Sequence, residues 1–475
     1  MRILVAIANY GDGNRAYVER LIDEYRRMSF DVDIVILSDR DKRFGDDVEV
    51  RVGLPTSDPW SLPFAHKRLF AERAVNYDLF IYSEDDTLIT ERHIRAFLDA
   101  TAAVPHPRIV GFMRYEEAPN GERSSSTVHS HFRWKPDSVE RINGYTLAEF
   151  TNAHAAAFIL TQQQLRHAID SGGFLVEPHS EHYDLPCTAA TDPYTQCGMR
   201  KVIPISHLDE FLIHHMPNKY LGKLGIPLSE LHAQVETLCT TGTVPAQQLF
   251  PTEKRLDHSR YDRSYHESAN VQLSALLPQS GSVLSVGCGY GALEASFLER
   301  GLRVAAIPLD NVIAGSARSR GVEILSFAAH PLDHQCFTSA LNGRRFDAIV
   351  LSNVLQHVTN PPELLLRLSG VLSESGVIIG VVPNFARIRR RGEWRSLRRQ
   401  GYAQTLLHPT SAHEVRRWLR RAGLQGQVSH NVTARRRHLS RLGLGLLDSL
   451  LADDVVFTAG RQNNPRRRDE KQPRA

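Results

Sequence analysis

The stretch SVLSVGCGYG, residues 282–291, decides the fold of the second half of the chain. Its apolar first part is typical of a buried strand, and a helical pattern follows the glycines. Gly287, Gly289 and Gly291 allow a tight turn and a close backbone approach to a ligand, with helix N–H groups pointing at it. A tight turn needs glycine even without a ligand, and the spacing is not the G-x-G-x-x-G of dinucleotide sites. The stretch therefore predicts strand, turn and helix, and leaves the ligand open.

The residues after this turn repeat the same alternation. RVAAIPLD (303–310), VEILSF (322–327) and FDAIVLSNVLQHV (346–358) read as strands with their loops. Residues 361–376 read as a helix with proline at its start and Gly376 after its end, and VIIGVVPN (377–384) reads as a further strand. Continuous apolar strands that alternate with helices predict a parallel sheet covered on both faces.

Together these motifs resemble the class I S-adenosylmethionine-dependent methyltransferases. The resemblance covers about 264–460 and includes TLLHPTSAHEVRRWLRRAGLQ (405–425), which is similar to that family's late segment. It implies S-adenosylmethionine as the cofactor, held by the three glycines and Asn353. It also implies that Gln356 and His357 face the methyl donor and the substrate, with His357 as a candidate general base. The competing interpretation of His357 is a structural loop histidine.

One position departs from the family. An acidic residue at the end of the second strand normally holds the ribose of the cofactor, and here Pro308 occupies that position. Proline offers no acceptor. Asp310, two residues later, is the expected substitute. The alternative is a methyltransferase-like domain that has lost catalysis.

The first half of the chain contains a second alternating system. RILVAIANY (2–10), VDIVILSD (32–39), YDLFIYSEDD (77–86) and RIVGFMRYE (108–116) read as buried strands, with a helical pattern over 17–28. The fold class is therefore α/β with two Rossmann-like domains. Boundaries follow from composition: a domain over 1–220, a linker over 221–263 that is poor in strand signal, the second domain over 264–460, and a polar basic tail over 461–475.

Glu84, Asp85 and Asp86 end the third of these strands. Three adjacent carboxylates repel one another, and burying them is costly unless a cation or hydrogen bonds compensate. The carboxyl end of a parallel strand is where α/β folds bind ligands, and hard oxygen ligands suit Mn²⁺ or Mg²⁺. The motif predicts a metal site, against the simpler interpretation of a solvated acidic loop.

This motif resembles the DxD-type motif of GT-A glycosyltransferases, including those in which it reads E-D-D. The resemblance covers about 1–220. It implies that Asp86 binds the metal, that Glu84 and Asp85 contact a nucleotide-sugar, and that a late histidine, His214 or His215, returns to the metal. We prefer His215, because an alternating strand turns only one of the two inward. The resemblance also implies four further contacts with the nucleotide-sugar. Asn9 and Asp39 lie at the ends of the first two strands, Lys67 lies on the following helix, and Lys219 lies near the diphosphate.

The acceptor side is less defined. An inverting transferase needs a base for the acceptor hydroxyl, and EPHSEHYDLPCTAATDP (177–193) offers several carboxylates. Glu181 and Asp184 are the candidates we retain, and no spacing separates them.

Composition limits partners and compartment. The 475 residues are 42% hydrophobic with a net charge of +4, which gives no global argument for nucleic acid. The five cysteines are widely spaced without a CxxC pair, and no apolar run reaches about 18 residues, so we expect a cytoplasmic protein. Arginine clusters in 387–399, 435–437 and 466–468 read as solvated faces or as contacts with an anionic membrane.

The sequence thus predicts a bifunctional enzyme. The first domain would transfer a sugar from a nucleotide-sugar to a glycan or small-molecule acceptor, and the second would methylate a glycan or glycoconjugate. Two alternatives are a methyltransferase with an N-terminal acceptor-binding module, and a non-catalytic scaffold at the inner membrane face.

Overall fold

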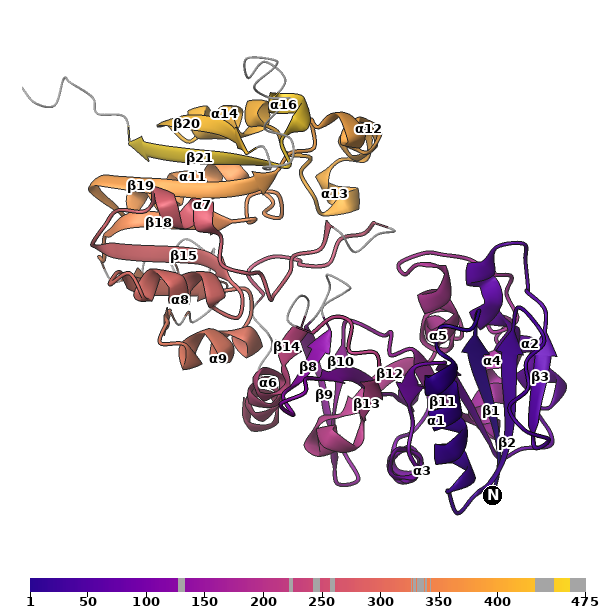
Figure 1. Cartoon of the computed structure of the whole chain (residues 1–475). Helices are drawn as coiled ribbons and strands as arrows, with labels where there is room; N and C mark the ends of the chain where they lie inside the picture. The colour runs from indigo at the N-terminus through magenta and orange to yellow at the C-terminus, as the bar shows by residue number, and fades with distance from the viewer. Residues whose placement is uncertain are drawn as a thin grey trace, which may run out of the picture. The chain divides into compact units, whose positions relative to one another are not determined.

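The computed structural model describes residues 1–126, 133–221, 225–241, 248–256, 261–325, 327, 330, 337, 340–341, 343–431 and 448–461. The chain forms two compact units, which divide near residue 246 (Figure 1). Helix α6 (Leu228–Thr241) belongs to the first unit, and Leu249 donates a backbone hydrogen bond to Leu309 in the second. The region that the sequence assigns to a linker is therefore largely divided between the two units.

The first unit is built on a sheet with the order β11-β4-β1-β2-β3. Strands β1 (Arg2–Asn9), β2 (Asp31–Ser38), β3 (Val48–Val52) and β4 (Leu79–Glu84) are parallel, and β11 (Ala157–Thr161) is antiparallel to β4. Helices α1 (Arg15–Arg26), α2 (Ala65–Glu72) and α4 (Gln162–Asp170) accompany it. Leu4, Ala6 and Phe80 pack with Leu69 and Phe70 of α2 in one core. The register sets Ala8 beside Glu84, so the ends of β1 and β4 meet.

Two further sheets complete this unit. One has the order β6-β12-β10-β9, with β6 (Arg108–Val110), β12 (Arg200–Pro204), β10 (Tyr145–Phe150) and β9 (Trp134–Ile142). The other has the order β14-β8-β7-β13-β5, with β14 (Gly225–Pro227), β8 (Arg123–Ser126), β7 (Met113–Glu117), β13 (Leu212–His215) and β5 (Thr87–Leu88). Helix α3 (Glu91–Ala103) and the 3₁₀ helix η2 (Ile205–Glu210) connect them. Helix α5 (Leu185–Thr195) precedes β12, and the 3₁₀ helix η1 (Pro59–Phe64) lies between β3 and α2.

The prediction of a single strand over 108–116 is wrong. The segment forms two strands, β6 and β7, in different sheets. The break falls at Gly111, where a Cβ would overlap the side chain of Lys201. The close approach of that side chain explains the glycine, and the break carries β7 to the side of β13.

The second unit has a seven-stranded sheet with the order β17-β16-β15-β18-β19-β21-β20. Its strands are β17 (Glu323–Ile324), β16 (Arg303–Pro308), β15 (Ser282–Cys288), β18 (Phe346–Ser352), β19 (Leu372–Pro383), β21 (Asp454–Arg461) and β20 (Leu424–Asn431). The first five are parallel, and β21 runs antiparallel to both of its neighbours. Leu284 and Val283, adjacent in β15, enter different core clusters, as expected for a sheet buried on both faces.

The helices of this unit are α7 (Val271–Leu276), α8 (Ala292–Leu298), α9 (Asn311–Ser319), α11 (Pro361–Gly370), α12 (Arg391–Gln400), α13 (Tyr402–Thr405), α14 (Ala412–Arg421) and α16 (Asp448–Leu451), with a 3₁₀ turn η4 (Ile388–Arg390). Helix α11 ends at Gly370, not near Gly376 as predicted. Leu372 pairs with Phe346 in the sheet, so the residues from Leu372 onward, which the helical pattern included, belong to strand β19.

Candidate functional site

The glycine turn connects β15 to α8 as predicted. Gly287 and Gly291 have φ values of 81° and 91°, in the left-handed region that favours glycine. A Cβ at Gly289 would overlap the carbonyl oxygen of Tyr265, which accepts a 2.9 Å hydrogen bond from the backbone N–H of Tyr290. The segment before the sheet therefore lies directly on the turn, and this contact requires glycine at position 289.

That segment also carries two charged residues which the sequence did not single out. Arg263 donates to the carbonyl oxygen of Gly287 at 3.1 Å and forms a 2.5 Å ion pair with Glu267. Glu267 in turn accepts hydrogen bonds from Ser352 and Asn353, each at 3.3 Å, at the end of β18. The Nε of Arg263 is buried and has no hydrogen-bond partner among the described residues. A buried, unsatisfied guanidinium donor beside the glycine turn fits an anionic group such as the carboxylate of S-adenosylmethionine.

Asp310, the predicted ribose contact, caps a helix. Asp310 is buried, and its Oδ1 accepts from the backbone N–H groups of Val312 and Ile313 at 2.9 Å, so it caps α9. Pro308 ends β16 beside Cys288, as its sequence position predicts. The role of Asp310 in holding the ribose stays a prediction.

His357 lies in the loop after β18 and is buried. Its ring stacks on Phe250 at 5.4 Å, and its Nδ1 has no hydrogen-bond partner among the described residues. Burial, followed by the charge of Lys254, lowers the pKa of His357 well below its usual value. The imidazole is therefore neutral at physiological pH and is a weak base.

In the first unit, the structure brings Asp86 and His215 together. The antiparallel pairing of β5 with β13 sets His215 opposite Thr87, and the Nε2 of His215 lies 3.4 Å from Oδ2 of Asp86. On the other side of the ring, Nδ1 lies 2.7 Å from Oε1 of Glu116 on β7. A carboxylate on the far nitrogen fixes the tautomer and leaves Nε2 facing Asp86, as in many metal sites. His215 is buried, whereas its neighbour His214 is half-buried.

Asp85 faces a different set of partners. Its two oxygens accept from the side-chain amides of Asn9 and Asn14, each at 2.7 Å. Lys42 donates to the Oδ1 of Asn9 at 2.6 Å and lies 3.8 Å from Asp39, whose Oδ1 accepts from the N–H of Gly11. The predicted residues Asn9, Asp39 and Asp85 thus meet where β1, β2 and β4 end.

The three adjacent carboxylates differ in acidity. Burial, followed by the charge of Asp86, raises the pKa of Glu84 to about 7, and burial raises that of Asp85 to about 6. Burial also opposes ionisation of Asp86, but the hydrogen bond to His215 and the charge of Lys219 lower its pKa overall. Negative charge at neutral pH is therefore held most firmly on Asp86, the predicted metal ligand.

These shifts predict a pH-dependent stability. A folded-state carboxyl pKa above its unfolded value of about 4 means that stability is lost as pH rises from about 4 to about 7. The Glu84 side chain is 26% exposed, which reduces its effect by solvent screening. We expect the stability of the wild type relative to Glu84→Gln to fall by about 1–3 kcal/mol between pH 5 and pH 8, measured by calorimetry of the full chain. Using this difference cancels the titration of the buried histidines. A difference that does not change with pH contradicts the prediction.

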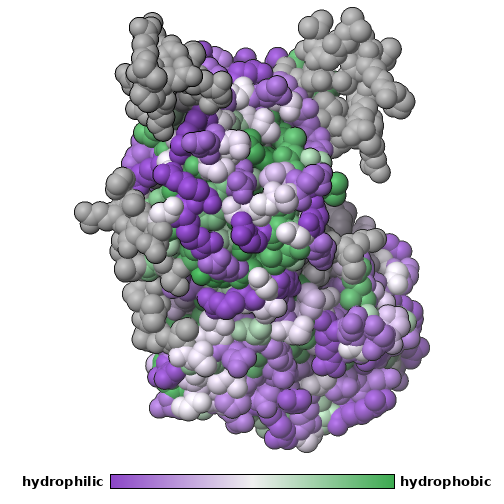
Figure 2. All heavy atoms as spheres, turned by 90° about the vertical axis from the view of Figure 1, so that its left-hand side faces the viewer, coloured by the Kyte–Doolittle hydropathy of each residue, from purple (hydrophilic) through white to green (hydrophobic). Residues whose placement is uncertain are grey.

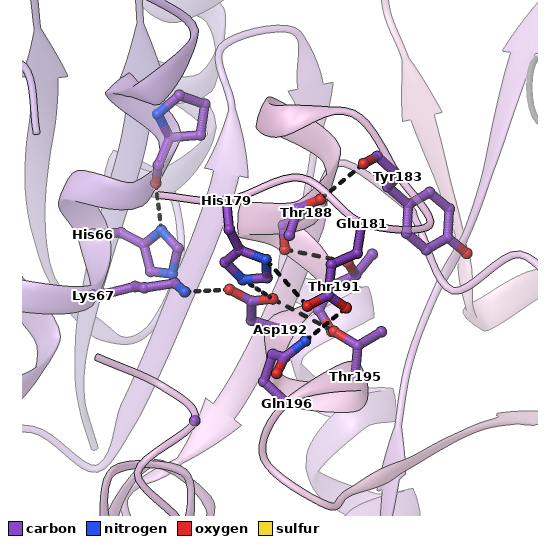
Figure 3. A network of polar contacts seen from close by, with 12 residues as sticks. His66, Lys67, His179, Glu181, Tyr183, Thr188, Thr191, Asp192, Thr195 and Gln196 are labelled. Atoms are coloured by element: carbon purple, nitrogen blue, oxygen red, sulfur yellow. Dashed lines mark hydrogen bonds and ion pairs between the residues drawn. The ribbon is translucent and has the colours of Figure 1, made fainter. Parts of the chain in front are cut away.

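The predicted donor contact Lys67 lies in a buried network instead (Figure 3). Its Nζ pairs with Asp192, and both side chains are almost fully buried. Figure 3 shows the ring of His179 between Asp192 and Glu181, at 3.4 Å and 3.6 Å from their oxygens. Glu181 is 61% exposed and accepts from Gln196. Burial lowers the pKa of Lys67, and Asp192 opposes the shift. The ammonium of Lys67 is therefore paired with Asp192 and is not free to bind a phosphate.

Asp184 occupies the first position before α5 and caps it, accepting from the N–H of Cys187 at 3.2 Å. Burial, followed by the charges of Glu84 and Asp184, raises the pKa of the Cys187 thiol. Asp184 therefore shares an electrostatic environment with the E-D-D motif. The contacts of Glu181 instead run to His179 and Gln196.

The donor chemistry of Asp86 and His215 fits a divalent cation in part. Within the described ranges, no group of three or more His, Cys, Asp or Glu side chains is arranged to hold a metal. A Mg²⁺ or Mn²⁺ ion that bridges phosphates needs only one or two protein ligands, because phosphate oxygens and water complete its shell. The pair fits an ion of that kind and not an all-protein metal centre.

Comparison with known proteins supports the methyltransferase prediction for the C-terminal region. Residues 258–428 match the model of a family described as a methyltransferase domain. An uncharacterised methyltransferase of Mycobacterium tuberculosis and one of Mycobacterium bovis are each 31% identical over an alignment of 138 residues that covers 27% of this chain. The chain spans 65% of the length of these relatives. The C-terminal region is therefore similar in sequence to methyltransferase domains.

Two solved methyltransferase structures are also similar to part of the chain. A possible histamine N-methyltransferase from Thermotoga maritima is 17% identical with a TM-score of 0.29, over 40% of this chain and 86% of that one. A methyltransferase from Burkholderia thailandensis, solved with S-adenosylhomocysteine, is 22% identical with a TM-score of 0.28, over 41% and 76%.

None of the described helices is long and apolar enough to cross a bilayer. On the face drawn in Figure 2, hydrophilic residues are interspersed with smaller groups of hydrophobic ones.

Proposed function

We propose that the C-terminal domain catalyses methyl transfer from S-adenosylmethionine to a glycan or glycoconjugate. The observation that carries this proposal is the glycine turn, with Arg263 on Gly287 and an unsatisfied guanidinium nitrogen beside it, in a region that matches a methyltransferase family. When bound, the cofactor supplies an electrophilic methyl group. Gly287, Gly289, Gly291, Arg263 and Asn353 would hold it.

In this domain we propose that His357 positions the acceptor and does not remove its proton. The Nε2 of His357 lies 3.3 Å from the side-chain NH2 of Gln356, which can only donate, so the neutral ring carries its proton on Nδ1. The buried, unsatisfied Nδ1–H can donate a hydrogen bond to the oxygen of an acceptor hydroxyl. Its lowered pKa makes it a poor general base, and methyl transfer relies largely on bringing two reactants into line.

We further propose that the N-terminal domain transfers a sugar from a nucleotide-sugar in a metal-dependent reaction. The arrangement of Asp86, His215 and Glu116 carries this proposal. Asp86 and His215 would hold Mn²⁺ or Mg²⁺, which would offset the charge of the departing diphosphate. Asn9, Asp39 and Asp85 would contact the nucleotide-sugar, with Glu84 and Lys219 beside the metal ligands. Asp184 is our preferred base for the acceptor hydroxyl. The charges of both Asp184 and Glu84 raise the pKa of the Cys187 thiol, so Asp184 lies near the E-D-D motif.

Isothermal titration tests both proposals on the full chain. S-adenosylmethionine and a panel of nucleotide-sugars, each with and without Mn²⁺, are titrated separately. We expect S-adenosylmethionine to bind without metal and one nucleotide-sugar to bind only with it. Binding of S-adenosylmethionine alone favours a methyltransferase with an N-terminal acceptor-binding module. Failure of every ligand at millimolar concentration favours a non-catalytic scaffold.

A further inference from the structure

A small pocket in the methyltransferase domain has an unusual charge. It encloses about 300 Å³ and is lined by the start of α11, by α12 and α13, and by α14. Arg398, Arg417 and Arg421 line it together with a single carboxylate, Glu414. Its size is at the lower limit for a small-molecule site, which suits one compact group.

The positive charge of this pocket is only partly compensated. Glu414 is buried and lies 2.6 Å from Arg417 and 3.8 Å from Arg398. No carboxylate among the described residues lies within ion-pair distance of Arg421. The Nε of Arg417 is buried without a hydrogen-bond partner in the described part of the chain. Three guanidiniums and one carboxylate leave a charge of +2 and at least one unsatisfied donor.

The pocket adjoins the candidate acceptor loop. Thr359 and Asn360, which line it, lie two and three residues after His357 along the chain. Tyr402, another lining residue, donates from its hydroxyl to the carbonyl oxygen of His357 at 2.6 Å. Ligands of α/β sheets bind at the carboxyl ends of the strands, and this loop leaves the carboxyl end of β18.

We propose that this pocket binds a phosphoryl group on the methyl acceptor. A phosphomonoester carries a charge of about −1.5 to −2 at pH 7, which matches the +2 of the pocket, and guanidinium forks bind phosphate oxygens in pairs. A carboxylate would leave the pocket with net positive charge. This inference rests on the methyl-transfer function proposed above and defines its substrate class as phosphorylated. The phosphoryl group belongs either to a soluble phosphorylated acceptor or to a lipid headgroup.

The same helices provide matched controls. Arg395 on α12 and Arg420 on α14 are exposed and do not line the pocket. The test compares Arg398→Gln/Arg421→Gln with Arg395→Gln/Arg420→Gln, which remove the same charge from the same two helices. Arg417 is left intact, because its removal would leave Glu414 buried without its closest partner.

Binding of methyl phosphate to the full chain is measured by titration, with methyl sulfate as a monoanionic comparison. Sedimentation with vesicles that contain phosphatidic acid tests the lipid source. We expect the pocket variant to bind methyl phosphate at least about tenfold more weakly than the wild type, and the control variant to equal the wild type. Vesicle binding that is lost only in the pocket variant assigns the phosphoryl group to a lipid. No vesicle binding assigns it to a soluble acceptor.

Three results overturn the inference: no saturable methyl phosphate binding by the wild type, equal losses in both variants, or binding of methyl sulfate as tight as that of methyl phosphate. Each indicates a diffuse basic surface and not a phosphoryl pocket. Titration of S-adenosylmethionine on the same samples separates this outcome from failure of the methyl-transfer proposal, because the pocket variant retains Arg263 and the glycine turn.

Discussion

Replacement of Asp86 by asparagine is expected to weaken Mn²⁺-dependent nucleotide-sugar binding by more than about 100-fold, because even the outer-shell partners of a bound metal contribute about 10–100-fold. Asp86 is the one carboxylate of the E-D-D motif whose pKa is lowered, and it faces His215 at 3.4 Å. Asparagine keeps the size of the side chain but removes the charge that a hard cation needs. Titration of the full-length variant with nucleotide-sugar, with and without Mn²⁺, measures the change.

Glu116→Gln provides a graded test of the same site. Among the described residues, the side chain of Glu116 hydrogen-bonds to the far nitrogen of His215 and to the backbone N–H of Tyr220, so we expect an intermediate loss of about 10–100-fold in metal affinity. Asp46→Asn serves as the control, because the Asp46 side chain is 91% exposed and pairs with the exposed Arg43. Equal nucleotide affinity in the wild type and in Asp86→Asn, with no response to Mn²⁺ in either, would contradict a metal site here.

The sequence anticipated the centre of this site because two simple rules apply to it. Parallel strands place their carboxyl ends at one edge, which brings Asn9, Asp39 and Asp85 together. Alternation along a strand turns only one of two adjacent histidines inward, which selected His215. The supporting residues were not predictable in this way. Glu116, Asn14 and Lys42 act through contacts with segments distant in sequence, and nothing in their local pattern indicates the partner.

Burial is the other property that the sequence left undetermined. Lys67 is predicted to contact the nucleotide-sugar from a helix, yet it pairs with Asp192 inside the unit, 125 residues away along the chain. In the second unit the glycine turn was predictable, because its strand-turn-helix signal is local. Arg263 and Glu267 lie in a segment without periodicity, and only the tertiary contact of Tyr265 with Tyr290 places them on the turn.

Gly289→Ala is expected to weaken S-adenosylmethionine binding by at least about 100-fold, which corresponds to about 3 kcal/mol. The new Cβ overlaps the carbonyl oxygen of Tyr265, a backbone atom that cannot rotate away as a side chain would. The segment that carries Tyr265 must shift, and Arg263 and Glu267 shift with it. The variant therefore disturbs the turn and the charged pair above it in one step.

A general loss of stability would also reduce the binding of S-adenosylmethionine. A comparison variant, Gly370→Ala, and a second measurement, the affinity for nucleotide-sugar, separate this cause from a local change at the turn. Gly370→Ala adds the same methyl group at a helical position with nothing within 4 Å, and alanine favours helix. We expect this variant to match the wild type in S-adenosylmethionine affinity. Gly289→Ala should keep its nucleotide-sugar affinity, since the change lies in the other unit. If Gly289→Ala binds S-adenosylmethionine like the wild type, the turn does not hold the cofactor. The close approach of Tyr265 would then be a packing contact, and the methyl-donor site would have to lie elsewhere in the domain.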